Sequence, residues 1–599
     1  MLEQREAWLG IDLGTQSVRV LAVTSDGTVV GRGSAPLTGH RKGDRHEQDA
    51  GEWWRGVCTA SRQAMGEVRG HARGVRIGGL AVCGTSGTVV LTDVAGRPMG
   101  PALMYDDGRA GEEAARVRAV GVRAQDTWAL PKAVWLVEEY GGEGSGGLGA
   151  GEGLGAGGGG GSGAGGTGGD GGLESRPGDG LGTGGGDGSG SGRGDGSAGV
   201  RGRSRGVTDG SGAGVPGSPP RGPQGRPRYG RRSRLHLARP PRVRLAHQPD
   251  TVVARLTGEP SPTDSSHALK TGYDLEHDAW PYGALTELCL PDGLLPDVVR
   301  PGTRLGEVCA VAAEATGIPA GTPVIAGMTD GCAAQIASGA LRPGAWNSVL
   351  GTTLVLKGAA VDPLRDPTGV VYNHRAPDGT WLPGGASSVG AGVLTAAFAG
   401  ADPAAMDARA AAHEPSGAVT YPLVSPGERF PFRAPQASSL LLGEPRDDAD
   451  LWAALLQGVA FTERLCLDYL HHLGAPLDGP LTFTGGGARS PYWNQLRADI
   501  LGRPARVPAQ TEPALGMAAL AAYGTGAGSL VDITDHMVRI ETALDPRPSR
   551  TALFAEPYAR LVDELTARGW LPTPLAHHAH ARLRADTGGG AGGRDTPGS

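Results

Sequence analysis

Residues 10–17 of this chain read Gly-Ile-Asp-Leu-Gly-Thr-Gln-Ser, and these residue types at this spacing suit a polyphosphate. Apolar residues alternate before and after the turn, which predicts a β-hairpin whose strands both enter a core. Glycine at the turn lets a polyanion approach the backbone, and the acid on the first strand is placed to hold a metal ion. We expect Asp12 to bind the metal and the phosphates to contact Gly14, Thr15, Gln16 and Ser17. An ordinary first hairpin with a chance acid is the alternative.

The arrangement recurs in the second half of the chain, where an expected strand over 346–350 leads to Gly-Thr-Thr and a returning strand over 354–356. Farther on, three glycines stand between an apolar strand and a helix expected over 491–501. Glycines at that junction allow a nucleotide to come close to the backbone. The expected nucleotide contacts are Gly351, Thr352, Thr353, Gly485, Gly486, Gly487 and Asn494.

Asp330 follows the short apolar strand 324–326 and precedes a helix of small residues. Its carboxylate could accept the proton of an attacking hydroxyl, and the alternative role is a helix N-cap. Thr85 and Ser86 in a polar loop, together with Asp107, could hydrogen-bond a polyol, although Asp107 or its neighbour Asp106 could equally be a turn residue. A site that transfers a phosphoryl group must hold the polyphosphate and Mg²⁺, place the acceptor hydroxyl and supply a base, and each part has a candidate here.

Composition divides the chain. Of the 90 residues in 141–230, 42 are glycine, out of 105 in all 599 residues. Such a stretch buries too little apolar surface to offset its ordering entropy, so we expect 141–244 to be a disordered insertion and 576–599 a disordered tail. The rest alternates strands and helices, which favours an α/β sheet. One Gly-Thr hairpin in each half predicts a duplicated α/β domain with a cleft between the copies, the insertion interrupting the first copy.

Several classes of protein are excluded by charge and cysteine usage. The net charge of −6 argues against a general nucleic-acid binder, and we read the basic stretch 201–244 as a solvated linker, with a docking element for an acidic partner as the alternative. The six cysteines have no metal-ligand or redox spacing, and no run of eighteen apolar residues occurs. We expect a cytoplasmic protein that contacts neither membrane nor nucleic acid; a homodimer stays open.

Taken together, these segments resemble the FGGY carbohydrate kinases, which share the α/β fold of actin and hexokinase, with two ribonuclease H-like domains around a cleft. Residues 10–17 resemble the family's first phosphate motif, 327–331 the segment with its catalytic aspartate, and 351–353 its second phosphate motif. Residues 485–490 resemble its adenosine-binding region. The resemblance implies a sugar-binding domain over 1–326, a nucleotide-binding domain over 327–575, Asp330 as the base, and ATP with Mg²⁺ as cofactors.

The subfamily is indicated by departures from the xylulose kinases, which usually carry Met-His-Gly where this chain has Thr85-Ser86-Gly87 and a tryptophan where it has Tyr105. These features are similar to the D-ribulose kinase branch, as are residues 266–274. The resemblance therefore implies phosphorylation of D-ribulose to D-ribulose 5-phosphate. The alternatives are a D-xylulose kinase, a kinase for another ketose or polyol, and a sensor that binds sugar and nucleotide without turnover.

Overall fold

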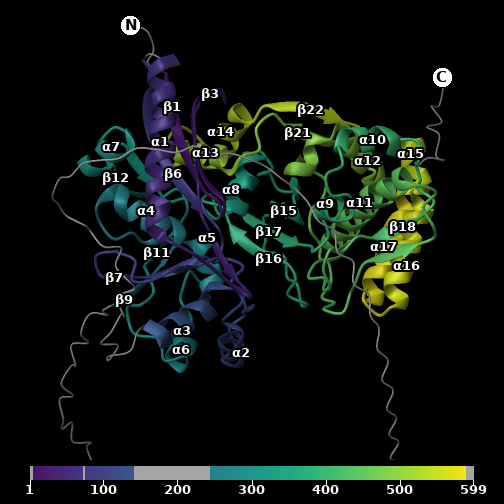
Figure 1. The fold of residues 1–599 in the computed structure, drawn as a ribbon, viewed down its shortest axis with the longest axis horizontal. Helices are drawn as coiled ribbons and strands as arrows, with labels where there is room; N and C mark the ends of the chain where they lie inside the picture. The colour runs from purple at the N-terminus through teal and green to yellow at the C-terminus, as the bar shows by residue number, and fades with distance from the viewer. Residues whose placement is uncertain (1–4, 72–73, 141–242, 589–599) are drawn as a thin grey trace, which may run out of the picture. The chain divides into compact units, whose positions relative to one another are not determined.

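The computed structural model describes residues 5–71, 74–140 and 243–588. Almost all of the expected insertion, and the last part of the expected tail, lie outside these residues. The described chain is α/β, with its strands in two large sheets and three smaller ones (Figure 1). None of its helices is both long and apolar enough to cross a bilayer.

The first large sheet contains the hairpin predicted at residues 10–17. Its strands run in the order β12 (Arg304–Glu307), β13 (Pro323–Ile325), β6 (Arg76–Gly84), β1 (Glu6–Leu13), β2 (Ser17–Thr24) and β3 (Val29–Pro36). β1 and β2 pair antiparallel, with Leu13 opposite Val18, which confirms the hairpin. The apolar positions of β1 and β2 are buried in a core shared with α1 (Ala50–His71), α4 (Gln248–Thr257) and α7 (Ala310–Thr316).

The other face of this sheet is covered by α8 (Asp330–Ala337) and by α13 (Pro513–Gly524), a helix from the far end of the chain. Glycines permit this close packing. A Cβ on Gly10 would stand 1.7 Å from the backbone oxygen of Ala514, and one on Gly516 would stand 2.0 Å from that of Ala333. The proposed boundary at 326/327 therefore separates two sheets but not two independent cores, because α13 returns to the first sheet.

The second large sheet contains the repeated hairpin. Its order is β16 (Tyr372–Arg375), β17 (Trp381–Ala386), β15 (Leu354–Gly358), β14 (Trp346–Leu350), β20 (Leu481–Thr484), β21 (Ala505–Pro508) and β22 (Ile540–Leu544). β14 pairs antiparallel with β15, as predicted, and parallel with β20. The core beside it includes side chains of α11 (Asp448–His472) and α12 (Pro491–Leu501).

A smaller sheet joins the two sides of the Gly-rich segment. β7 (Val89–Asp93) pairs antiparallel with β9 (Val243–His247), so strands that flank residues 141–242 in sequence are neighbours in space. This pairing agrees with the prediction that the insertion interrupts one domain. It also corrects the end of the insertion, because residues 243 and 244 belong to a strand.

The prediction of a disordered tail over 576–599 was wrong for the first half of that range. Residues 573–588 form the helix α17 (Thr573–Gly588), and its apolar residues at helical spacing, Leu575, Ala579 and Leu583, are buried in the core beside α11 and α16 (Ala555–Ala567). Composition hid this helix, since three histidines and two arginines share its surface with those few apolar positions.

Candidate active site

Three predicted segments meet at one edge of the first sheet. β1, β6 and β13 are parallel neighbours, so their carboxyl ends lie together. Asp12 pairs with Cys83 and Leu13 with Gly84, and Gly84 in turn bridges to Thr329. The hairpin turn after Leu13, the loop after Gly84 and the catalytic candidate after Thr329 therefore share this edge, which in open α/β sheets is where ligands bind.

Asp12 is a buried acid without a full set of partners. Its side chain is 2 % exposed, and its contacts are the Arg19 guanidinium at 3.4 Å and the Cys83 thiol at 3.5 Å. Burial, reinforced by the charge of Asp330, raises its pKa to about 6. A cation beside these two carboxylates would relieve both effects, so the donor set fits a hard divalent metal.

Asp330 is the first residue of α8, and Thr329 before it occupies the N-cap position. The alternative prediction, that Asp330 is the helix N-cap, is therefore wrong, because the N-cap is the residue before it. Its Oδ1 accepts a hydrogen bond from the amide of Gly331 at 2.7 Å, and the side chain is half-buried. Asp330 thus combines partial exposure with proximity to Asp12, as a general base at the edge of a site requires.

The candidate sugar loop is held from behind by Gln248, which sequence reasoning missed. Its Oε1 accepts from the amide and the hydroxyl of Thr85, both at 2.8 Å, and the Thr85 hydroxyl also contacts that of Thr88. The Ser86 hydroxyl, in contrast, is buried with no hydrogen-bond partner among the described residues. An unpaired buried hydroxyl is costly unless a ligand or water satisfies it, which makes Ser86 the better candidate of the two for contacting a polyol.

Asp107 lies in the same region, but its carboxylate is already occupied. It is fully buried and accepts hydrogen bonds from the Arg109 guanidinium and from the amide of His46. Its neighbour Tyr105 is 40 % exposed; burial and the charges of Asp106 and Asp330 raise its pKa. Tyr105, two residues before the predicted position, is thus more exposed than Asp107 and lies within electrostatic reach of Asp330.

The nucleotide candidates gather at a corresponding edge of the second sheet. Val349 on β14 pairs with Thr484 on β20, so the Gly351–Thr353 turn and the glycine triplet follow two parallel neighbours. Gly485 has φ +84°, and a Cβ there would stand 2.6 Å from the backbone oxygen of Leu350. Glycine is required at that position because the two turns approach so closely.

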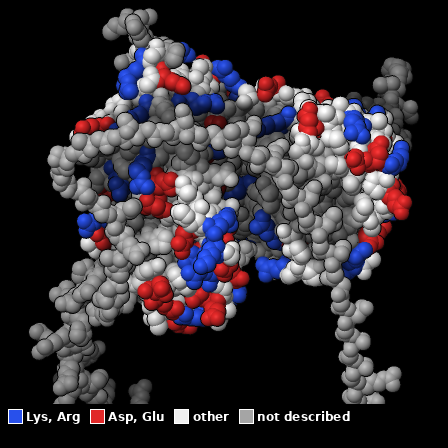
Figure 2. Space-filling view, in the orientation of Figure 1, with Lys and Arg blue, Asp and Glu red and all other residues white. Residues whose placement is uncertain are grey.

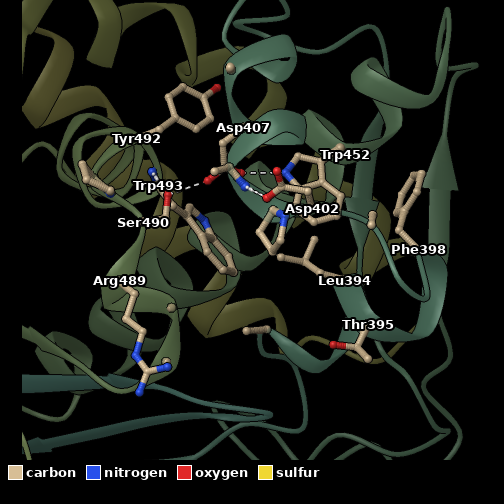
Figure 3. A pocket seen from close by; sticks show the side chains of 18 of the residues that line it. Leu394, Thr395, Phe398, Asp402, Asp407, Trp452, Arg489, Ser490, Tyr492 and Trp493 are labelled. Carbon is tan, nitrogen blue, oxygen red and sulfur yellow. Dashed lines mark hydrogen bonds between the residues drawn. The ribbon is translucent and has the colours of Figure 1, made fainter.

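A cavity of about 840 Å³ opens beside the glycine triplet. Figure 3 shows Leu394 and Phe398 on one side of it and Arg489 and Trp493 on the other. Asp407 stiffens this wall by accepting from Trp452 Nε1 at 2.8 Å and from the Ser490 hydroxyl at 2.6 Å. An aromatic cavity with a few fixed polar groups is typical of a site for a planar ligand.

A second cavity of about 790 Å³ connects elements of both sheets. It is lined by Arg19 of the first hairpin, by Gly485 and Gly486, and by Asn494 and Glu512. Asn494 is 5 % exposed, and its Nδ2 donates to the backbone of Ala488, while its Oδ1 has no partner among the described residues. Arg19 was not predicted, although the expected hairpin places it on the second strand directly opposite Asp12.

No group of three or more histidine, cysteine or acidic side chains in the described ranges is placed to hold a metal ion. On the face in Figure 2 the described basic and acidic side chains are interspersed.

Comparison with known proteins agrees with this geometry. Residues 7–129 match the model of the N-terminal domain of the FGGY family of carbohydrate kinases, and residues 346–525 match that of its C-terminal domain. A xylulose kinase from Streptomyces rubiginosus is 29% identical over 86% of this chain and 87% of its own length.

Solved structures share the two-domain α/β fold. A xylulose kinase from Rhodospirillum rubrum aligns with a TM-score of 0.69 at 23% identity, over 95% of this chain and 99% of that one. The Plasmodium falciparum glycerol kinase solved with ADP aligns with a TM-score of 0.69 at 14% identity, over 94% and 98%. This chain belongs to the FGGY family of carbohydrate kinases and is a sugar phosphotransferase.

Proposed function

We propose that the chain transfers the terminal phosphoryl group of ATP to a hydroxyl of a ketopentose. The observation that carries the proposal is the shared edge of β1, β6 and β13, where Asp12, Ser86 and Asp330 come together. D-Xylulose is the acceptor we favour, because curated relatives that cover 86% of the chain are named xylulose kinases.

D-Ribulose is the second candidate, and a specific feature favours it. The loop Thr85-Ser86-Gly87 resembles the D-ribulose kinase branch rather than the Met-His-Gly usual in xylulose kinases. The two sugars differ in the configuration of one hydroxyl, so a site discriminates them by which hydroxyl meets a paired group. Ser86, with its free hydroxyl, is a candidate for that group.

In this proposal each group at the two edges has one task. Asp330 accepts the proton of the attacking hydroxyl, and Ser86 orients the sugar. The amides and hydroxyls of residues 14–17 and 351–353 hold the transferred phosphate, and Asp12 holds Mg²⁺. When bound, Mg²⁺ neutralises charge on the β- and γ-phosphates. Closing the site over the sugar would exclude water and limit wasteful ATP hydrolysis.

A panel of acceptors tests the proposal directly. We expect ADP release to rise with D-xylulose or D-ribulose well above the rate without acceptor, and the ratio of the two kcat/KM values identifies the sugar. L-Ribulose and glycerol serve as acceptors of altered stereochemistry and length. If none of these acceptors increases ADP release, the proposal is overturned. Tight sugar binding without turnover would favour the sensor.

The aromatic cavity beside the glycine triplet is the proposed place of the nucleobase. Phe398 packs edge-on against Trp452, with ring centroids 5.4 Å apart, and presents its ring to the cavity. Stacking of a base on an aromatic ring is worth about 1–3 kcal/mol. The variant Phe398→Ala is therefore expected to raise KM for ATP by about tenfold, with the sugar KM and kcat unchanged, in steady-state kinetics. An unchanged KM for ATP would place the base elsewhere.

Activity is expected to fall as the pH drops through about 6 at limiting Mg²⁺. The pKa of Asp12 is raised to about 6 by burial and by Asp330, so protons compete with the metal for this carboxylate below that pH. Raising the Mg²⁺ concentration should move the acid limb of the pH profile to lower pH. If the acid limb of the pH profile does not shift with Mg²⁺ concentration, the proposal that Asp12 binds the metal is contradicted.

A further inference from the structure

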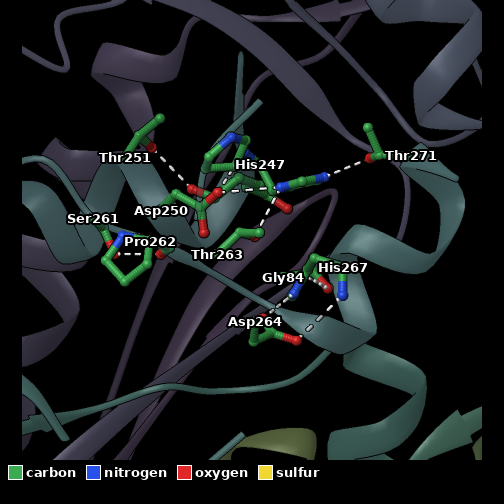
Figure 4. A network of polar contacts seen from close by, with 12 residues as sticks. Gly84, His247, Asp250, Thr251, Ser261, Pro262, Thr263, Asp264, His267 and Thr271 are labelled. Atoms are coloured by element: carbon green, nitrogen blue, oxygen red, sulfur yellow. Dashed lines mark hydrogen bonds and ion pairs between the residues drawn. The ribbon is translucent and has the colours of Figure 1, made fainter. Parts of the chain in front are cut away.

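A short segment behind the sugar loop makes an unusual set of contacts. Asp264 caps α5 (Ser265–Ala268), which continues directly into the 3₁₀ turn η1 (Leu269–Thr271). One carboxylate oxygen of Asp264 accepts from the amide and the hydroxyl of Ser266, at 2.9 and 2.6 Å. The other contacts His267 Nδ1 at 2.5 Å, as Figure 4 shows. Asp264, Ser266 and His267 are all buried.

Three side chains of this segment reach the two loops that carry the proposed substrate groups. The Ser266 hydroxyl accepts from the amide of Thr329 at 2.9 Å, immediately before Asp330. His267 Nε2 lies 3.3 Å from the carbonyl oxygen of Gly84, and Lys270 Nζ donates to that of Ser86 at 3.0 Å. The Asp264 carboxylate thus orients Ser266 toward the segment of the proposed catalytic base and His267 toward the sugar loop.

These contacts exceed what packing of a short helix requires. Gly84 and Thr329 already bridge as neighbouring strand ends, and the segment adds a polar tie to each of them. Misplacing reacting groups by about 1 Å can cost about 10² in rate, so ties that fix the relative position of two loops have catalytic value.

We propose that Ser266 and His267, oriented by Asp264, are positioning residues that set the placement of Asp330 relative to the sugar loop. The inference rests on the proposed kinase function and deepens it. Neither residue touches the reacting atoms. Ser266 acts through the backbone of Thr329, and His267 acts through the carbonyl of Gly84.

The protonation of His267 gives this role a signature in pH. Burial lowers its pKa, but the Asp264 carboxylate outweighs burial and raises it. The other charged or titratable groups that act on or face the imidazole are Asp250, the His247 ring at 5.9 Å and His374. While protonated, the ring donates to both Asp264 and Gly84. Once it loses a proton, the Gly84 tie is lost, so catalytic efficiency should fall on the alkaline side of that pKa.

The test compares His267→Ala, His267→Gln and Ser266→Ala in the full-length enzyme with the best acceptor of the panel. We expect both alanine variants to lower kcat/KM for the sugar at least tenfold with an unchanged KM for ATP. His267→Gln retains an amide donor for Gly84, so it should recover part of the loss and abolish the alkaline limb of the pH profile.

His277→Ala is the matched control, because His277 forms the same i,i+3 pair with Asp274, at 2.7 Å, on the surface. It should leave every kinetic parameter unchanged. Normal sugar kinetics in folded His267→Ala and Ser266→Ala would overturn the inference while the wild-type turnover upholds the kinase proposal. Failure of all three variants to fold would assign the segment to stability alone and overturn it as well. A wild-type enzyme that turns over no acceptor overturns the kinase proposal and this inference with it.

Discussion

Replacing Asp330 by Asn is expected to lower kcat by about two to four orders of magnitude, the usual contribution of a general base. The amide keeps the shape of the side chain and can still accept the hydrogen bond from the Gly331 amide through its oxygen. It cannot take the proton of the attacking hydroxyl, so substrates would bind without reacting. Single-turnover ADP formation with D-xylulose or D-ribulose measures the loss directly.

The control for Asp330→Asn is binding. Because the nucleotide cavities are lined by other residues, the Kd for ATP should stay within a few-fold of the wild-type value. Thermal stability should not fall, since the residue is half-buried at the start of a helix and its charge adds to the cost of ionising the buried Asp12. Near-normal turnover in this variant would remove Asp330 from the mechanism and leave the reaction in need of another base.

The two edges of the proposed site were predictable because each is built from local patterns. A hairpin with glycine at its turn is encoded within eight residues, and a strand that ends in a polar loop before a helix is encoded within about ten. The rule that ligands bind beyond the carboxyl ends of parallel strands then brings such loops together without any knowledge of distant contacts. The Asp12 and Asp330 segments followed this route.

The residues that sequence reasoning missed are those whose role depends on a distant partner. Gln248 supports Thr85 from 163 positions away, across the Gly-rich segment, and His267 reaches Gly84 from 183 positions away. Nothing in the neighbouring sequence distinguishes His267 from a packing histidine. Asp107 shows the converse, since an acid in a promising loop is fully engaged by Arg109 and the His46 amide. Side-chain satisfaction is a tertiary property, and local spacing does not reveal it.

The variant Asp12→Asn is expected to lower kcat/KM for the magnesium complex of ATP by about two to three orders of magnitude, because a metal's charge stabilisation is worth several kcal/mol. The amide preserves volume but binds Mg²⁺ poorly. Saturating Mg²⁺ should restore only part of the activity, and the acid limb near pH 6 should disappear with the titrating group. Mg²⁺ titrations of wild type and variant at two pH values measure both effects.

Although Asp12→Asn lowers activity, it should raise the free energy of unfolding of the metal-free protein. This result would distinguish a metal ligand from an acid that stabilises the fold. Above pH 6 the buried Asp12 carboxylate is ionised, at a cost to the metal-free fold of about 3 kcal/mol for a pKa raised from 3.8 to about 6. That cost disappears as the pH falls below 4, because the carboxyl is then protonated in both folded and unfolded states. Without metal, the variant should thus unfold at a higher urea concentration than wild type at pH 8, and at the same urea concentration near pH 4.

Added Mg²⁺ should stabilise only the wild type, since only its carboxylate pair attracts the cation. If Asp12→Asn instead destabilised the metal-free protein at pH 8, the Arg19 and Cys83 contacts would be the reason for this acid, and the metal would have to bind elsewhere.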